Sequence, residues 1–122
     1  MHNKPKYTLF KNTTYALAGL ADVTKHESSF KLQLLLFVVA GVTAWLLPID
    51  IVYKFILNIS LFLPIMAELA NSAVERVVDL VTKEYHILAK QAKDAGAALV
   101  LVSLVTTGAI WICTLLLAFK LV

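Results

Sequence analysis

A cluster of acidic and amide side chains lies between two long apolar stretches, in the sequence AELANSAVERVVDL at positions 67–80. On a helix that advances ~100° per residue, four polar residues fall within about 80° of one another: Glu68, Asn71, Glu75 and Asp79. We call these four residues the acidic ridge. Like charges at such spacing repel, and one ionised residue at bilayer depth costs roughly 2.5–3.5 kcal/mol on insertion scales. Something must therefore offset the charge of the ridge.

Three arrangements can offset this charge. Cations from other helices can pair with the ridge, although the chain's cations are mostly lysines in flanking segments. Protonation can neutralise Glu68, the deepest member, because burial disfavours the charged form. A divalent cation can bind Glu75 together with Glu27, because carboxylate and phosphate oxygens are the usual ligands of Mg²⁺. Alternatively, a polar ridge on a membrane helix simply holds helices together or lines an ion path.

The sequence offers few other sites for metals or phosphates. The histidines His2, His26 and His86 lack the spacing of transition-metal ligands. There is also no Gly-rich loop of the Walker or kinase type, which excludes a soluble-type kinase.

The connection VTKEYHILAKQAKDAGAA after the ridge contains side chains that suit a nucleotide. An aromatic ring and an imidazole can stack, a cation can bind phosphate, and carboxylates can bind ribose or the adenine amine. These residues are Glu84, Tyr85, His86, Lys93 and Asp94. A solvated loop or helical hairpin with ordinary charges is the alternative interpretation.

The elements that must position these residues belong to a membrane protein. The 122 residues are 60% hydrophobic and 16% charged, and the mean hydropathy is +0.81. This composition is too apolar for a water-soluble globule. The net charge of +3 comes without a basic stripe that alternates with aromatics, which argues against a nucleic-acid-binding protein.

Three segments are apolar and long enough to cross a bilayer, which takes ~20 residues. They cover residues 30–47, 51–83 and 95–119. Pro64 predicts a kink in the second segment, whose polar end should extend beyond the membrane. Residues 7–25 have helical periodicity without enough apolar length to span, which predicts an amphipathic helix on the membrane surface. A short helix packed on the bundle without lipid contact is the alternative. The sequence thus predicts a single-domain, all-α membrane protein.

The basic residues predict the orientation of these segments. Nine of the eleven lysines and arginines lie either before residue 32 or in the connection at 76–94. The positive-inside rule places both regions in the cytoplasm and the C-terminus outside. Chemistry built on the acidic ridge then faces the cytoplasm, where ATP is.

Taken together, these residues resemble the prokaryotic diacylglycerol kinase family of small membrane enzymes. The family signature has a Glu, then Asn-Ser/Thr-Ala, then an aliphatic residue and Glu, then Val-Asp. It is matched by Glu68, Asn71, Ser72, Ala73, Val74, Glu75, Val78 and Asp79. KEYH and AKDAG are similar to two further family motifs. The resemblance implies a homotrimeric bundle of three-crossing subunits in the bacterial cytoplasmic membrane, with active sites between subunits near the cytoplasmic interface.

The resemblance also implies roles for single residues. Glu68 would be the base that takes the proton from the lipid hydroxyl, Asn71 would support it, and Glu27 and Glu75 would bind Mg²⁺. Nucleotide contacts would come from Tyr15, Glu27, Glu75, Glu84, Tyr85, His86, Lys93 and Asp94. The lipid would contact Glu68 and two lysines, Lys31 and Lys54. The chain departs from the family pattern at Thr8, Gln33, Ala70 and Ala97, and Asp79 receives no role.

The implied reaction is Mg-assisted, in-line phosphoryl transfer from ATP to sn-1,2-diacylglycerol, which gives phosphatidic acid. An undecaprenol kinase of the same family is the nearest alternative, although KHESSFKLQ at the first apolar segment is closer to the diacylglycerol branch. An alternative from another class is a small oligomeric channel or transporter lined by Glu68 and Glu75. Such a pore has no need of Glu27 or of the KEYH and AKDAG motifs.

Overall fold

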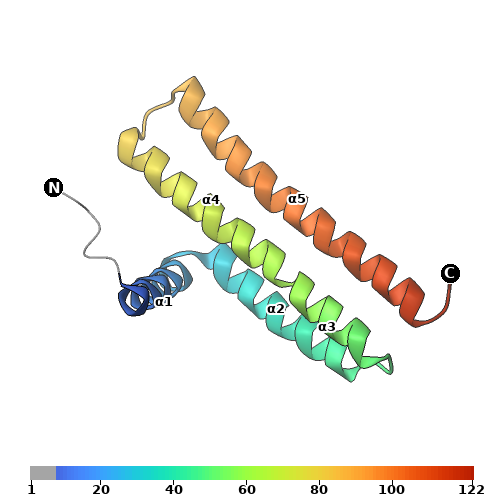
Figure 1. Cartoon of the computed structure of the whole chain (residues 1–122). Coiled ribbons are helices and arrows are strands. Elements are labelled where there is room, and N and C mark those ends of the chain that lie inside the picture. Colours follow the sequence, from blue (N-terminus) through green and yellow to red (C-terminus); the bar gives the residue numbers. More distant parts are fainter. Residues whose placement is uncertain (1–7) are drawn as a thin grey trace.

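A computed structural model describes residues 8–122 and folds them into five helices. These are α1 (Leu9–His26), α2 (Ser28–Leu46), α3 (Ile51–Ser60), α4 (Phe62–Val81) and α5 (Ile87–Ala118). The α3–α4 pair lies between α2 and α5, whereas α1 runs crosswise at the start of α2 (Figure 1). The described residues contain no strand, and the predicted all-α class is confirmed.

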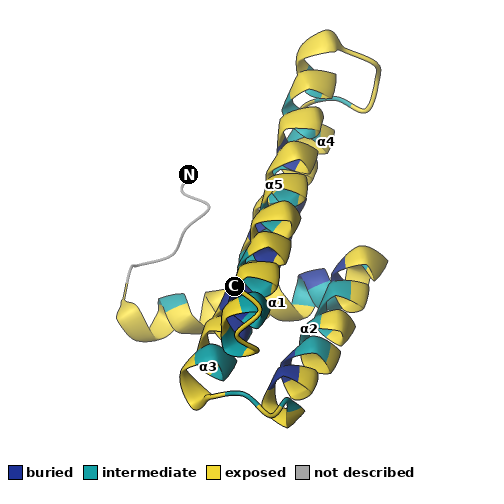
Figure 2. Ribbon diagram, turned by 90° about the vertical axis from the view of Figure 1, so that its right-hand side faces the viewer, coloured by how far each residue is buried: buried dark blue, intermediate teal, exposed yellow. Residues whose placement is uncertain are grey.

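Three helical segments of the described chain are long and apolar enough to cross a membrane: Ser28–Leu46, Ile51–Val81 and Ile87–Ala118. Most of their large apolar side chains are exposed in the single chain, and exposed residues run along each spanning helix (Figure 2). Deeply buried side chains are few, with Phe30 and Leu57 the largest. The outer surfaces therefore have the apolar character that lipid or a further subunit requires.

The first helix is joined to the second by one residue. Thr8 caps α1, since its hydroxyl oxygen accepts a hydrogen bond from the Lys11 N–H at 3.3 Å. Residue 7, where the predicted surface helix starts, lies outside the described residues. Glu27 ends α1 and begins α2 with an extended backbone, at φ −117° and ψ 112°. This junction lets α1 leave the direction of the bundle.

The turn between α2 and α3 lies at the opposite end of the bundle from α1 (Figure 1). Helix α2 ends before Pro48, because a proline disfavours helical geometry in the residue that precedes it. Asp50 starts α3 by accepting a hydrogen bond from the Val52 N–H at 3.0 Å. Lys54 Nζ donates to the Trp45 carbonyl at 2.8 Å and so satisfies the C-terminal end of α2.

The second spanning segment is interrupted at Leu61, between α3 and α4. Leu61 keeps helical angles, φ −66° and ψ −18°, so the two helices continue in nearly the same direction (Figure 1). Pro64 explains the interruption, because it has no N–H to donate to the Ser60 carbonyl. The Thr107 hydroxyl of α5 lies 3.3 Å from that carbonyl and 2.9 Å from the Ser103 carbonyl. The expected kink is thus a one-residue interruption that a neighbouring helix bridges.

Replacing Thr107 with valine should lower the free energy of unfolding by about 0.6 kcal/mol, the mean for hydrogen bonds between membrane helices. In a Pro64→Ala background the new N–H can donate to the Ser60 carbonyl, so the same substitution should cost less. A double-mutant cycle from unfolding in detergent measures the difference. Equal costs in the two backgrounds would contradict the link between Thr107 and the proline.

The connection between the last two helices is shorter than the apolar pattern indicates. Helix α4 ends at Val81 and α5 begins at Ile87 rather than at residue 95. Residues 87–94 are mostly good helix formers, so the helix extends beyond its apolar part. The His86 ring caps α5, because Nδ1 accepts a hydrogen bond from the Leu88 N–H at 3.2 Å. The polar connection is therefore a helical hairpin with a tight turn.

Candidate active site

The acidic ridge on α4 is divided between two neighbouring faces. Glu68 is hydrogen-bonded to side chains of α2, and Ser72 is hydrogen-bonded to Glu27 beside it. Asn71 and Asp79 instead contact α5. Residues on one stripe of the helical wheel therefore serve two different groups of partners.

Glu68 is the buried member of the ridge, with 7% of its surface exposed. Its Oε1 accepts a hydrogen bond from the Ser29 hydroxyl at 3.0 Å, and its Oε2 accepts one from the Gln33 amide at 3.1 Å. Only the NH₂ end of Gln33 can donate to a carboxylate, which leaves Gln33 Oε1 buried without a hydrogen-bond partner. Neutral donors thus fix the Glu68 carboxylate and leave it lone pairs that can accept a proton.

Asn71 lies between Glu75 and α5. Its Nδ2 donates to Glu75 Oε1 at 3.3 Å, and its Oδ1 is buried without a hydrogen-bond partner. A Cβ atom built on Gly96 would lie 2.3 Å from this oxygen. Helices α4 and α5 can approach this closely only because residue 96 has no side chain.

Replacing Gly96 with alanine should displace Asn71 and lower the free energy of unfolding by about 1–3 kcal/mol, as overpacking does elsewhere. Activity should fall with it, because Asn71 holds the Glu75 carboxylate. Gly108→Ala on the same helix is the matched control, since nothing lies within 4 Å of the added methyl group. Unfolding in detergent and turnover measure both effects. Equal behaviour of the two variants would contradict the close approach at Gly96.

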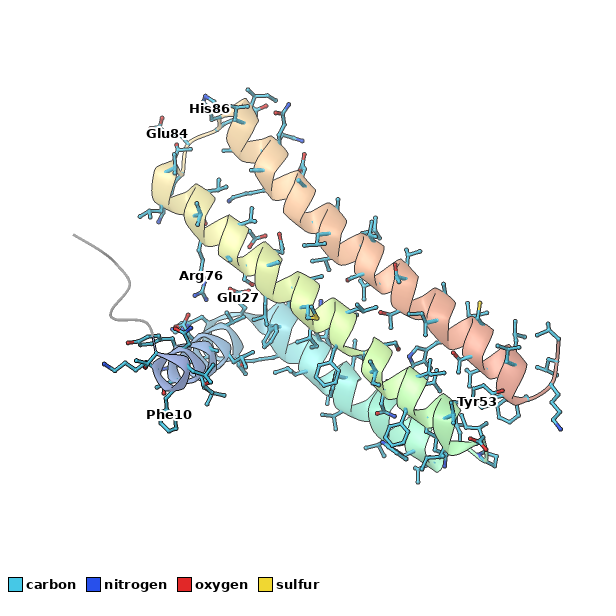
Figure 3. The ribbon with its side chains drawn as sticks, in the orientation of Figure 1. Phe10, Glu27, Tyr53, Arg76, Glu84 and His86 are labelled. Atoms are coloured by element: carbon cyan, nitrogen blue, oxygen red, sulfur yellow. The ribbon has the colours of Figure 1, made fainter. Side chains whose placement is uncertain are left out.

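Glu27 points from the α1–α2 junction toward Arg76 of α4 (Figure 3). Its Oε2 accepts a hydrogen bond from the Ser72 hydroxyl, and its Oε1 lies 3.2 Å from Arg76 Nη2. The other end of the guanidinium, Nη1, lies 2.5 Å from Asp22 Oδ2. The hydrogen bond from Arg76 is the main reason why the pKa of Asp22 is lowered. Arg76 therefore joins α1, the junction and α4.

A groove of about 390 Å³ lies at the α4–α5 turn. It is lined by all five candidate nucleotide residues of the connection, together with one member of the ridge: Glu84, Tyr85, His86, Lys93, Asp94 and Asp79. Glu84 and His86 lie at the turn itself (Figure 3). Lys93 Nζ lies 2.7 Å from Asp79 Oδ1, and Lys90 Nζ lies 2.5 Å from Asp94 Oδ2. A bound phosphate would compete with Asp79 for Lys93.

The remaining candidate residues lie outside this groove. Tyr15 is exposed on α1, and Lys31 is exposed on the first turn of α2. Lys54 precedes Glu68 by fourteen residues, so it lies about 21 Å away along a nearly continuous helix axis. The single chain therefore does not bring Lys54 to Glu68, nor Tyr15 to the groove.

Sequence reasoning gave no role to four residues that contact the candidate site residues, Ser29, Gln33, Arg76 and Asp79, nor to Asp22, which joins α1 to Arg76. For some of these residues, helical spacing in the sequence indicates a shared face with a candidate site residue. Arg76 follows Glu68 by eight positions and Ser72 by four, which places the three on one helix face. Ser29 and Gln33 are likewise four positions apart on α2. Nothing in the pattern of α1 indicates a partner for Asp22.

The two carboxylates assigned to a cation are of the ligand type that Mg²⁺ prefers when a nucleotide supplies further oxygens. The described residues contain no group of three or more His, Cys, Asp or Glu side chains that could hold a metal ion by themselves. Glu75 is exposed and accepts a hydrogen bond from Asn71. Each carboxylate oxygen has two lone-pair sites, so Glu27 can also ligate while Ser72 and Arg76 hold it. Water and phosphate oxygens would supply the remaining ligands, as is usual for Mg²⁺.

Known proteins are similar to this chain over most of its length. A family model described as prokaryotic diacylglycerol kinase matches residues 14–115. Diacylglycerol kinase of Escherichia coli (strain K12) is 34% identical over 108 residues, which cover 88% of each chain. Diacylglycerol kinase of Haemophilus influenzae is 38% identical over 104 residues, 84% of this chain and 87% of the relative. That of Pseudomonas aeruginosa is 36% identical over 104 residues, 85% of each.

Proposed function

The chain belongs to the prokaryotic diacylglycerol kinase family, and on that basis we propose that it transfers the γ-phosphoryl group of ATP to sn-1,2-diacylglycerol. The products are phosphatidic acid and ADP. The observation that carries the proposal is the buried Glu68 carboxylate, fixed by Ser29 and Gln33 on a membrane-spanning helix. A lipid acceptor stays in the bilayer, so the base that takes the proton from its hydroxyl group must lie on a membrane-spanning helix.

In the proposed reaction, Glu68 accepts the proton of the lipid hydroxyl while the hydroxyl oxygen attacks the γ-phosphorus. The bond from the γ-phosphorus to its bridging oxygen breaks, and ADP leaves. Lys93 and the turn residues bind the nucleotide in the groove. Glu75 lies between base and groove along α4, about 10 Å from Glu68 by helix rise. Phosphoryl transfer depends mostly on positioning and electrostatics, which this arrangement supplies without a P-loop.

Glu27 and Glu75 would hold Mg²⁺ on the phosphate oxygens. When bound, the cation would neutralise charge that develops on the transferring group. Asn71 orients Glu75, and Ser72 with Arg76 orients Glu27. The two carboxylates thus each have a support that does not depend on the nucleotide.

The three spanning helices and the bacterial relatives indicate a bacterial membrane protein. We place it in the cytoplasmic membrane, with the N-terminus and the α4–α5 turn in the cytoplasm and α1 on the membrane surface. We also propose a homotrimer with active sites between subunits. Two observations support this assembly. The single chain leaves most apolar side chains of α5 exposed, and it leaves Glu27 and Tyr15 outside the nucleotide groove.

A two-acceptor assay tests the proposed function. The purified full-length protein in detergent is given Mg·ATP with diacylglycerol, with undecaprenol or with no lipid, and ADP and the lipid phosphate are measured. We expect lipid-dependent ADP release with diacylglycerol as the faster acceptor. Faster transfer to undecaprenol would change the acceptor, and no transfer together with ion flux in vesicles would favour a channel.

A further inference from the structure

Helix α1 contacts the rest of the chain through few buried groups. Val23 is its one buried residue. Next to it, an open and mostly apolar groove of about 470 Å³ separates α1 from α4, with Gly19 and Leu20 on one wall and Leu69 and Ala73 on the other. Packing alone therefore holds α1 weakly, and its polar contacts must largely set its position.

Arg76 supplies those polar contacts. One guanidinium bridges Asp22 of α1, at 2.5 Å, and Glu27 of the junction, at 3.2 Å. The side chains of Arg76 and Asp22 are each about half exposed. Without the cation between them, the two carboxylates would repel each other. A guanidinium presents several donors in a fixed planar fork, which suits a bridge between two carboxylates better than a lysine ammonium does.

Glu27 depends on this bridge more than a residue within a helix would. Its backbone is extended between two helices, so no helical neighbour restrains its side chain. The Ser72 hydroxyl and Arg76 hold its two oxygens from α4. Removing Arg76 leaves one restraint on the carboxylate and none of the ion pairs between α1 and α4.

We propose that Arg76 is a positioning residue that docks α1 on α4 through Asp22 and fixes the Glu27 carboxylate for the bound cation and nucleotide. The second part rests on the proposed function, whereas the first part does not. Exposed ion pairs add little to overall stability. The effect of Arg76 therefore falls on the position of α1 and on nucleotide binding, more than on unfolding.

The test compares Arg76→Gln, Arg76→Lys and Asp22→Asn with Lys25→Gln, which also removes an exposed cation beside the junction. Hydrogen exchange of α1 amides measures docking and needs no activity. The KM for Mg·ATP and kcat are measured on the same preparations. For Arg76→Gln we expect faster α1 exchange and a KM raised by about tenfold, as for residues that support a metal ligand, with kcat changed much less. Arg76→Lys should recover part of both effects.

Asp22→Asn separates the two parts, because it should speed α1 exchange while the Arg76–Glu27 pair keeps the KM near that of the wild type. Unchanged α1 exchange in Arg76→Gln would overturn the docking role, and an unchanged KM would overturn the role toward Glu27. Equal effects in Lys25→Gln would also overturn the proposal, because loss of positive charge would then explain them. If the wild type transfers no phosphoryl group, the proposed function fails, and α1 exchange still decides the docking role.

Discussion

Glu68→Gln is expected to abolish lipid phosphorylation while the chain stays folded. An amide cannot take the proton from the lipid hydroxyl, and a positioned general base contributes about 10²–10⁴-fold to the rate. The fold should survive because Gln33 can rotate its amide. Its Oε1, which has no hydrogen-bond partner in the structure, would then accept a hydrogen bond from the new NH₂ group. Ser29 can still donate to the new carbonyl oxygen.

Single-turnover phosphoryl transfer and unfolding in detergent measure the two outcomes for Glu68→Gln. Asp50→Asn is the control, since it makes the same carboxylate-to-amide change at the far end of the bundle. Asparagine caps helices about as well as aspartate, so this variant should keep both activity and stability. Phosphorylation by Glu68→Gln within tenfold of the wild-type rate would remove Glu68 from the role of base.

The number of membrane-spanning helices and the interruption in the second one can be predicted from the apolar segments and from Pro64. Apolar segments of spanning length predict the three crossings, and they predict a helix rather than a strand because the bilayer leaves no partner for an open backbone. Pro64 marks the interruption of the second crossing. The start of α5 at Ile87 was missed, because charged and amide residues interrupt the apolar pattern at 90–94 and hydropathy says nothing about helices that project beyond the membrane.

The candidate site was predictable only in part, because helical periodicity gives a shared face but not the partners of that face. Glu68, Asn71 and Glu75 form one stripe in sequence. In the structure, however, Glu68 is hydrogen-bonded to α2, whereas Asn71 packs against α5. The candidate nucleotide residues were easier to group, since the turn at 82–86 brings both ends of the connection together. Arg76 and Asp22 are 54 positions apart, and no local pattern connects them.

The departure at Gln33 shows why partners matter. In the sequence, Gln33 is only one of four positions at which the chain departs from the family pattern. In the structure its amide donates to the Glu68 carboxylate, which a second carboxylate could not do while ionised. Ser29 and Gln33 together donate hydrogen bonds to both oxygens of the buried Glu68 side chain, and burying such a polar group without hydrogen bonds is costly. Glu68 and its two donors therefore form one hydrogen-bonded unit across α2 and α4.

Glu75→Gln is expected to weaken the apparent affinity for Mg·ATP strongly and to leave the fold intact. The new side chain keeps a carbonyl oxygen for the Asn71 amide, whose bond to Glu75 is 3.3 Å long. It loses the negative charge through which a carboxylate ligand attracts Mg²⁺. Loss of a residue that only supports a metal ligand costs about 10–100-fold, so loss of the ligand itself should cost at least as much. Glu75→Asp keeps the charge and should retain part of the affinity.

The measurement is the KM for ATP over a series of free Mg²⁺ concentrations, with Asp50→Asn again as the control for a lost carboxylate. In Glu75→Gln the concentration of Mg²⁺ that gives half-maximal rate should rise, whereas the affinity for diacylglycerol should stay near that of the wild type. This separation follows from the position of Glu75 on the face of α4 toward α5, away from Ser29 and Gln33, which donate hydrogen bonds to Glu68. An unchanged Mg²⁺ dependence would contradict the ligand role. The carboxylate would then serve only to hold Asn71 against Gly96, where α4 and α5 pack closely.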